Sequence, residues 1–216
     1  IAANGEYSYT LYSNWLSLTG ITNFAISHEI TDSFDYTLFD GDLDPSSAIL
    51  EITKTIDALT PPSADANDVI VKEDLPMGPS ASGLINVTGA NGGVTSIDPV
   101  DGSFSYGGST ALPLKHNGVD ITVSVVGSSF IGMAGAVKVF ELSINTTSKS
   151  YDFTLFETWD HADEDDPVDE IDLSFDVIVT DGFGLTAEAE INVTVIDDNP
   201  IANDDSIEVK GFTDVV

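Results

Sequence analysis

Two segments of the chain repeat one pattern: an alternating apolar run, a Gly-containing acidic turn, and a second alternating run. The first copy occupies residues 34–57 and turns at Asp40-Gly-Asp42-Leu-Asp44; the second occupies residues 175–197 and turns at Asp181-Gly-Phe-Gly-Leu. Similarity at a spacing of about 141 residues is too long for one solenoid turn and indicates a tandem array of whole domains. Such an array favours a function of reach and rigidity over chemistry.

Period-2 alternation recurs along most of the chain, whereas helical periodicity is almost absent. Runs rich in β-branched and aromatic residues are separated by clusters of Gly, Asn, Asp, Ser and Pro, which is typical of short strands joined by turns. We therefore expect an all-β protein built as β-sandwiches. The predicted strands are Glu6–Tyr12, Ser33–Phe39, Ala48–Thr55, Asp68–Lys72, Ser82–Thr88, Val119–Val126, Ser129–Gly132, Val137–Ile144, Ser150–Phe156, Ile171–Thr180 and Thr186–Ile196.

The chain is strongly acidic but not hydrophilic. Six Lys and Arg residues stand against 37 Asp and Glu residues, which gives a formal net charge of −31, while 42% of the residues are hydrophobic. Disordered acidic chains lack that hydrophobic content, so a folded core is expected. The charge would repel nucleic acids and anionic lipid surfaces, and no apolar run approaches transmembrane length, so neither partner nor direct membrane insertion is expected. Divalent cations, Ca²⁺ above all, would relieve the repulsion.

Few residues are suited to catalysis. The chain has no Cys and only three His residues, His28, His116 and His161. The absence of Cys excludes a disulfide framework and a Cys-based zinc site. No Ser nucleophile sits in a strand-to-helix elbow, and repeated sandwiches offer no evident cleft for a pair of catalytic carboxylates. We therefore expect no enzymatic activity.

Two proline-containing breaks divide the chain. Each follows a strong strand with Asp, inserts Pro and continues with Asn and Asp, as at residues 57–68 and 197–205. Proline stiffens a connection and suits a boundary better than a strand interior. We predict that residues 1–60 are the C-terminal part of a truncated or split repeat, that residues 61–198 form one complete repeat, and that residues 199–216 are a linker and the first strand of a further unit. Residues 1–60 are expected to form a small sheet.

Acidic loops supply the first candidate metal ligands. Asp40, Asp42 and Asp44 alternate in one tight turn, so their carboxylates can converge on a cation that wants six to eight oxygens. The loop lacks the Gly and Glu of an EF-hand, and a merely solvated turn is the alternative. The acidic run 160–172 adds Asp160, Asp163 and Asp165, or is a solvated charge run. Within it, His161 lies among carboxylates and could be a ligand, but a surface histidine is the commoner case in an acidic loop, so His161 is expected at the surface.

The breaks between the predicted units supply the second set. An ion held there would lock the orientation of adjacent domains, whereas the alternative is a polar linker whose side chains form only turn hydrogen bonds. The candidate ligands are Asp57, Asp65, Asn67 and Asp68 at the first break, and Asp197, Asp198, Asn199, Asn203, Asp204 and Asp205 at the second.

Four ordered elements carry a resemblance to a known family. Residues 154–163 read Thr-Leu-Phe-Glu-Thr-Trp-Asp-His-Ala-Asp; residues 175–182, the alternating run from Ile191 and the ending Asp-Asp-Asn-Pro200 come after it in order. Together they resemble the long repeat of type I-secreted RTX adhesins of Gram-negative bacteria. Ala162 replaces the family's Pro, and Gly184-Leu185 replaces the acidic half of its second loop, so Asp181 is expected to serve the turn and not a metal.

The resemblance implies Ig-like sandwiches strung along a secreted giant protein of the bacterial cell surface and stiffened by Ca²⁺. It implies an extender that projects ligand-binding domains for adhesion and biofilm formation. Its partners would be neighbouring repeats and a ligand-binding domain inserted within a repeat, which would account for the incomplete first unit. The alternatives are a module that itself binds a glycan or peptide, through Trp15, Trp159 or the Gly-rich loops, and a cadherin-like homophilic contact.

Overall fold

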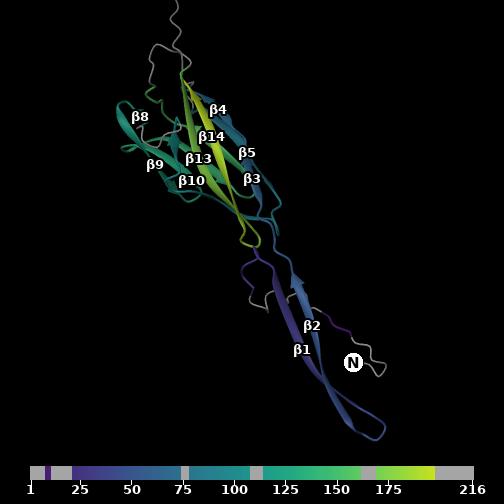
Figure 1. Ribbon diagram of the computed structural model, residues 1–216. Helices are drawn as coiled ribbons and strands as arrows, with labels where there is room; N and C mark the ends of the chain where they lie inside the picture. The colour runs from purple at the N-terminus through teal and green to yellow at the C-terminus, as the bar shows by residue number, and fades with distance from the viewer. Residues whose placement is uncertain (1–7, 11–20, 74–77, 108–113, 162–168, 198–216) are drawn as a thin grey trace, which may run out of the picture. The chain divides into compact units, whose positions relative to one another are not determined.

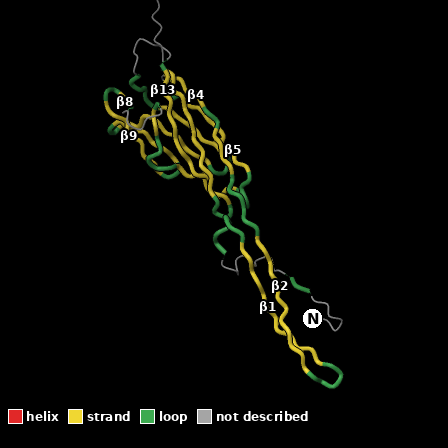
Figure 2. The backbone as a smooth tube through the Cα atoms, in the orientation of Figure 1, coloured by secondary structure: helices red, strands yellow, loops and turns green. Residues whose placement is uncertain are grey.

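The computed structural model describes residues 8–10, 21–73, 78–107, 114–161 and 169–197. These residues form strands and connecting loops only, as Figure 2 shows. The prediction of an all-β protein is confirmed. Within these ranges no helix is long and apolar enough to span a membrane.

The chain divides into two compact units, which are described separately. Unit 1 comprises residues 1–64, 87–96 and 178–188, and unit 2 comprises residues 65–86, 97–177 and 189–216. These limits differ from the division at residues 60 and 198 expected from the sequence, which stays a prediction.

Strands β1 (His28–Phe39) and β2 (Pro45–Ile56) form a long antiparallel hairpin (Figure 1). Phe34 pairs with Leu50 and Tyr36 with Ala48, so the alternating apolar residues share one face. On the opposite face, hydroxyl groups join the strands in two hydrogen-bonded pairs, Thr31–Thr53 at 2.9 Å and Thr37–Ser47 at 2.8 Å. This hairpin is the small sheet expected within residues 1–60. The strand predicted at Glu6–Tyr12 lies mostly outside the described residues, and residues 8–10 are not in a strand.

The remaining strands form two sheets, visible in Figure 1 as adjacent layers. The seven-stranded sheet has the order β3-β5-β12-β11-β10-β9-β8; the five-stranded sheet has the order β4-β14-β13-β6, with β7 paired to β13. Their bounds are β3 Ser63–Ala66, β4 Val69–Lys72, β5 Ser80–Thr88, β6 Val94–Pro99, β7 Ser105–Tyr106, β8 Lys115–His116, β9 Val119–Val126, β10 Ser129–Ala134, β11 Val137–Asn145, β12 Ser150–Leu155, β13 Glu170–Asp181 and β14 Thr186–Ile196.

Strands β4 and β14 form a parallel pair. Val69 lies opposite Val193 and Lys72 lies opposite Ile196. The chain therefore changes sheets between β3 and β4. Because the two strands are parallel, β4 and β14 end at the same end of the sheet. This pairing places the residues that come directly after the two strands side by side.

The core of unit 2 is aromatic. The rings of Phe130 and Phe175 lie 5.0 Å apart, and the ring of Phe140 lies 5.5 Å from that of Phe153 and 5.4 Å from that of Trp159. All five side chains are at most 5% exposed. Contacts of this kind stabilise the fold beyond the transfer of their area from water. Alternation along β11, β12 and β13 directs Phe140, Phe153 and Phe175 into the core, as the sequence pattern predicts.

Candidate metal centres

The turn between β1 and β2 is organised by Asp40. Its Oδ1 atom accepts hydrogen bonds from the backbone N–H groups of Asp42, at 3.2 Å, and Asp44, at 2.9 Å. The backbone N–H of Leu43 donates to the Asp40 carbonyl, and Leu43 itself has a φ of 72°. Left-handed backbone is unusual for a leucine and costs about 1–2 kcal/mol.

This turn gathers three carboxylates. A ligand oxygen from each of Asp40, Asp42 and Asp44 lies within 4.8 Å of the other two, and all three residues are exposed. The pKa of Asp40 lies below its ordinary value, because the Asp42 carboxyl, when protonated, and the backbone N–H group of Asp44 donate hydrogen bonds to its carboxylate. Like charges this close repel one another, so a divalent cation would be attracted to the turn.

The second copy of the turn, between β13 and β14, has the same bonding around Asp181. Its Oδ1 accepts the backbone N–H groups of Phe183 and Leu185, both at 2.9 Å, and Gly184 takes the left-handed position with a φ of 79°. Here the aspartate is buried, with 1% of its surface exposed. Its Oδ2 accepts the backbone N–H of Asn91 at 3.1 Å. The expected turn role of Asp181 is confirmed.

Burial and hydrogen bonding oppose each other at Asp181. Burial alone would raise the pKa of its carboxyl, but the N–H groups of Leu185, Phe183 and Asn91, together with the Asn91 side chain, favour the charged form more strongly. The pKa therefore lies below its ordinary value.

A second cluster lies at the ends of β4 and β14. Glu73 comes directly after β4 and Asp197 directly after β14, so the parallel pairing sets them next to each other. The Glu73 N–H donates to the Ile196 carbonyl at 3.0 Å, which extends the pairing of β4 with β14. The Asp197 N–H donates to the Asp169 carbonyl at 3.0 Å, which joins the end of β14 to the residue before β13.

His161 completes this cluster from a distant part of the chain. A ligand nitrogen of His161 and one carboxylate oxygen each of Glu73 and Asp197 lie within 4.8 Å of one another. The segment is anchored by the Trp159 N–H, which donates to Glu73 Oε1 at 2.9 Å, and by the Asp160 N–H, which donates to the Lys115 carbonyl at 2.9 Å.

Burial distinguishes this cluster from the Asp40 turn. The side chain of His161 is 3% exposed and that of Glu73 is 1% exposed. His161 Nε2 lies 3.6 Å from Glu73 Oε1, and Nδ1 lies 3.8 Å from Asp169 Oδ2, whose side chain is 24% exposed. Neither ring nitrogen of His161 has a hydrogen-bond partner among the described atoms. The prediction that His161 is a surface residue is wrong. The acidic neighbours of His161 in the sequence do not reveal that other parts of the chain bury its side chain.

The other predicted ligands are distributed between different roles. Both carboxylate oxygens of Asp160 accept backbone N–H groups, from Asn117 at 2.8 Å and Gly118 at 2.6 Å, which fixes the β8–β9 turn. Asn67 accepts a hydrogen bond from Asn86 at 2.9 Å, and Asp68 accepts one from Asn192 at 3.3 Å. None of these contacts tests ion binding, so their assignment stays a prediction.

At the first break, the structure places Asp57 just after β2 and Asp65 within β3, and neither belongs to a cluster of three metal-ligating residues among the described residues. Asp197 joins Glu73 and His161 in place of the linker residues expected beside it. The remaining predicted ligands, Asp163, Asp165, Asp198, Asn199, Asn203, Asp204 and Asp205, lie outside the described residues.

Sequence reasoning missed Glu73 entirely. It stands after the short run Val-Ile-Val-Lys, where a charged residue looks like the end of a strand and the start of a solvated loop. Only the parallel partner, more than 120 residues further on, brings it beside Asp197. The signal available was the Asp160-His161 pair within a segment rich in acidic residues.

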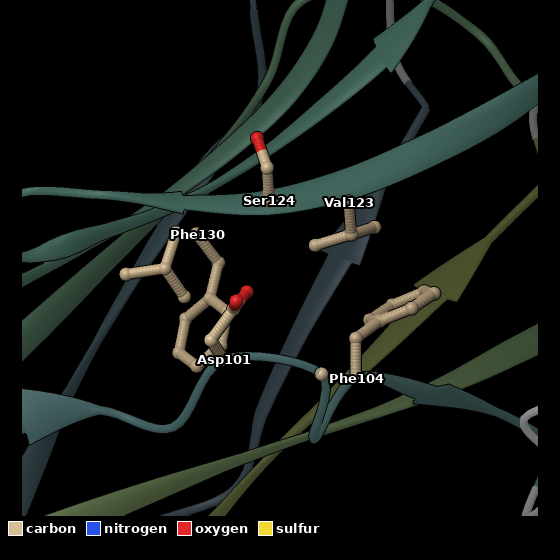
Figure 3. Close-up of a pocket in the computed structure, with 7 residues that line it drawn as sticks. Asp101, Phe104, Val123, Ser124 and Phe130 are labelled. Atoms are coloured by element: carbon tan, nitrogen blue, oxygen red, sulfur yellow. The ribbon is translucent and has the colours of Figure 1, made fainter.

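A shallow pocket lies elsewhere in unit 2. Its volume is about 130 Å³, and Figure 3 shows Asp101 and Phe104 opposite Val123 and Ser124 of β9. Sites for drug-sized ligands usually occupy about 300–1,000 Å³. Trp159, a candidate ligand-contacting aromatic, is buried in the core at 5% exposure, and Trp15 lies outside the described residues.

Comparison of the chain with protein-family models, with curated proteins and with solved structures found no match.

Proposed function

We propose that this chain is a calcium-stabilised extender segment of a bacterial RTX surface adhesin, which supports adhesion and biofilm formation by projecting ligand-binding domains away from the cell. The observation that carries the proposal is the Asp40 turn, where three carboxylates converge within 4.8 Å on the surface of a chain with a net charge of −31. Oxygen-rich exposed turns suit Ca²⁺, which accepts six to eight oxygen ligands in flexible geometry.

The role of the ion would be mechanical. The hydrogen bonds to Asp40 Oδ1 already hold the turn closed, and the other oxygens of Asp40, Asp42 and Asp44 stay available. A bound Ca²⁺ would remove the repulsion among them and stiffen the hairpin end. Ions at the predicted linkers would act in the same way between Ig-like domains, so that charge neutralisation and rigidity are obtained together.

The sandwich itself supports an extender over a module that binds a small ligand. Trp159 is buried in the core, where it contacts Phe140, and is therefore not available to a ligand. The pocket beside Phe104 is small. A homophilic or protein-binding contact is the second candidate. It is favoured by the apolar face of the β1–β2 hairpin, where Phe34 is 45% exposed and Leu38 is 59% exposed.

The test is thermal unfolding of the chain after removal of metals, with and without added CaCl₂. Calcium should raise the unfolding temperature, because an ion that binds only the folded state at 100 times its Kd contributes about 2.7 kcal/mol. The triple variant Asp40→Asn, Asp42→Asn, Asp44→Asn should lose part of this response.

A matched control removes the same charge from the same hairpin but outside the turn: Glu29→Gln, Asp35→Asn, Glu51→Gln, three exposed residues. It should keep the full calcium response. No calcium response in the unmodified chain, or equal losses in the two triple variants, would count against the proposed site.

A further inference from the structure

We propose that Glu73, His161 and Asp197 form a site for a transition-metal dication of the Zn²⁺ class, distinct from the exposed all-oxygen turn at Asp40. The side chains of Glu73 and His161 are buried there, and Asp197 is half-buried. The site does not depend on the adhesin proposal. It joins the ends of two parallel strands to a segment from a distant part of the sequence.

The first argument is the position of the imidazole. His161 is 97% buried at its side chain, yet neither ring nitrogen has a hydrogen-bond partner among the described atoms. A buried polar group without a partner costs about 1–3 kcal/mol, so native proteins rarely leave one in that state. Nε2 faces the carboxylate of Glu73. An ion between them would satisfy the nitrogen.

The second argument is the geometry. Two ligand atoms bound about 2.0–2.1 Å from a tetrahedral Zn²⁺ are roughly 3.3 Å apart. The distance from His161 Nε2 to Glu73 Oε1 is 3.6 Å. A carboxylate oxygen of Asp197 lies within 4.8 Å of a ring nitrogen of His161 and of a carboxylate oxygen of Glu73. Small side-chain rotations would therefore close the site. Three protein ligands leave the fourth position to water, as is common at zinc sites.

Neighbouring groups orient the proposed ligands. Metal-binding histidines usually present their second nitrogen to a carboxylate, which orients the ring. Here Nδ1 lies 3.8 Å from Asp169 Oδ2. Glu73 is oriented in turn by the Trp159 N–H. Asp169 is thus a positioning residue, and its loss should weaken binding less than the loss of a ligand.

The donor set selects the class of metal. Ca²⁺ and Mg²⁺ take oxygen ligands, whereas imidazole with carboxylates suits Zn²⁺ and its neighbours. The two ligand carboxylates balance the charge of one dication, and the Asp169 carboxylate beside Nδ1 adds one negative charge around the site. The competing occupant is a proton: a charged His161 would form ion pairs with Glu73 and Asp169 without any metal.

The experiment is a titration of the metal-free full chain with ZnCl₂ in excess CaCl₂, which occupies the exposed carboxylates. Calorimetry should give one tight equivalent of Zn²⁺, and Co²⁺ should give the visible spectrum of a tetrahedral nitrogen–oxygen site. His161→Gln should weaken Zn²⁺ binding by more than about 100-fold and Asp169→Asn by about 10-fold, since outer partners typically contribute 10–100-fold. The control His28→Gln should change nothing.

Three results would contradict the proposed metal site. No tight equivalent in excess calcium, an octahedral all-oxygen cobalt spectrum, or full affinity in a folded His161→Gln variant would each overturn the site in favour of the proton. If His161→Gln does not fold, the cobalt spectrum of the unmodified chain decides. Loss of the calcium response with an intact zinc equivalent would refute the proposed function and leave this site standing.

Discussion

Replacing Asp181 by alanine should destabilise the protein far more than replacing Asp40, although both organise the same turn. In each copy the aspartate Oδ1 accepts two backbone N–H groups, from positions two and four residues further on. The difference is burial, since Asp181 is 1% exposed and Asp40 is exposed. Comparing the two alanine variants therefore separates the contribution of the turn's hydrogen bonds from the contribution of burial.

The magnitude follows from the donors left behind. Asp181→Ala leaves three part-buried backbone N–H groups, of Asn91, Phe183 and Leu185, without their acceptor. A fully buried donor in that state costs about 1–3 kcal/mol. Entry of water would recover part of this, so we expect a loss of about 3–5 kcal/mol. Asp40→Ala exposes its two donors to water, and by analogy with exposed helix caps it should cost about 1 kcal/mol.

The assay is urea unfolding followed by far-UV circular dichroism, in chelator so that no ion contributes. Asp181→Asn is the intermediate case, because its amide keeps an acceptor for the turn but presents N–H to Asn91. A cost for Asp181→Ala below about 1 kcal/mol, or equal costs for the two alanine variants, would refute the reasoning from burial.

Four further outcomes are expected. Because the pKa of Asp181 is lowered from 3.8, its stabilisation is complete above pH 4 and is lost as pH falls through the folded-state pKa; Asp181→Asn should flatten that part of an acid unfolding curve. Burial, with a smaller effect of Asp68, raises the pKa of Tyr151 to about 12, so its stabilisation is lost between pH 10 and 12, and Tyr151→Phe should remove this loss from an alkaline unfolding curve. Leu43→Gly should relieve the left-handed strain and slow amide exchange in β1 and β2 about fivefold. Gly132→Ala should destabilise by at least about 1 kcal/mol in urea unfolding, because its Cβ would overlap the ring of Phe140.

The strands were predictable because their side chains alternate. Val119–Val126 and Thr186–Ile196 coincide with β9 and β14, and Asp68–Lys72 differs from β4 by one residue. Strands β3, β6, β7 and β8 were not predicted; β7 and β8 have two residues each, which carry no period. The parallel partner of β4 was not predictable either, because β pairing depends on packing between distant segments rather than on local preference.

The candidate sites also differ in whether they depend on local sequence or on pairing between distant segments. The Asp40 turn is local: three carboxylates at alternate positions converge whatever the rest of the chain does, and the structure brings them together. The cluster at Glu73 is non-local, and it draws on residues that share no motif. Of its three ligands only Asp197 was predicted, and with different partners.

The two copies of the repeat differ in what covers them. Phe175 and Val179 in β13 are fully buried, whereas the corresponding Phe34 and Leu38 in β1 are 45% and 59% exposed. The same alternating pattern therefore serves as a sandwich strand in one place and as an apolar surface in the other. Large exposed apolar patches of this kind often mark an interaction surface.

An ion should stabilise the cluster of Glu73, His161 and Asp197 more than the Asp40 turn, although only the Asp40 turn is recognisable as a metal site from the sequence. At the Asp40 turn water screens part of the repulsion between the carboxylates, so an ion there stabilises the chain less than an ion at a buried site. The side chain of His161 is 3% exposed and has no hydrogen-bond partner among the described atoms, so leaving the cluster without a cation or a proton would cost several times more. A count of acidic residues ranks these sites by charge, but the free energy of binding depends on burial. Zinc should accordingly stabilise the chain more per ion than calcium at the Asp40 turn.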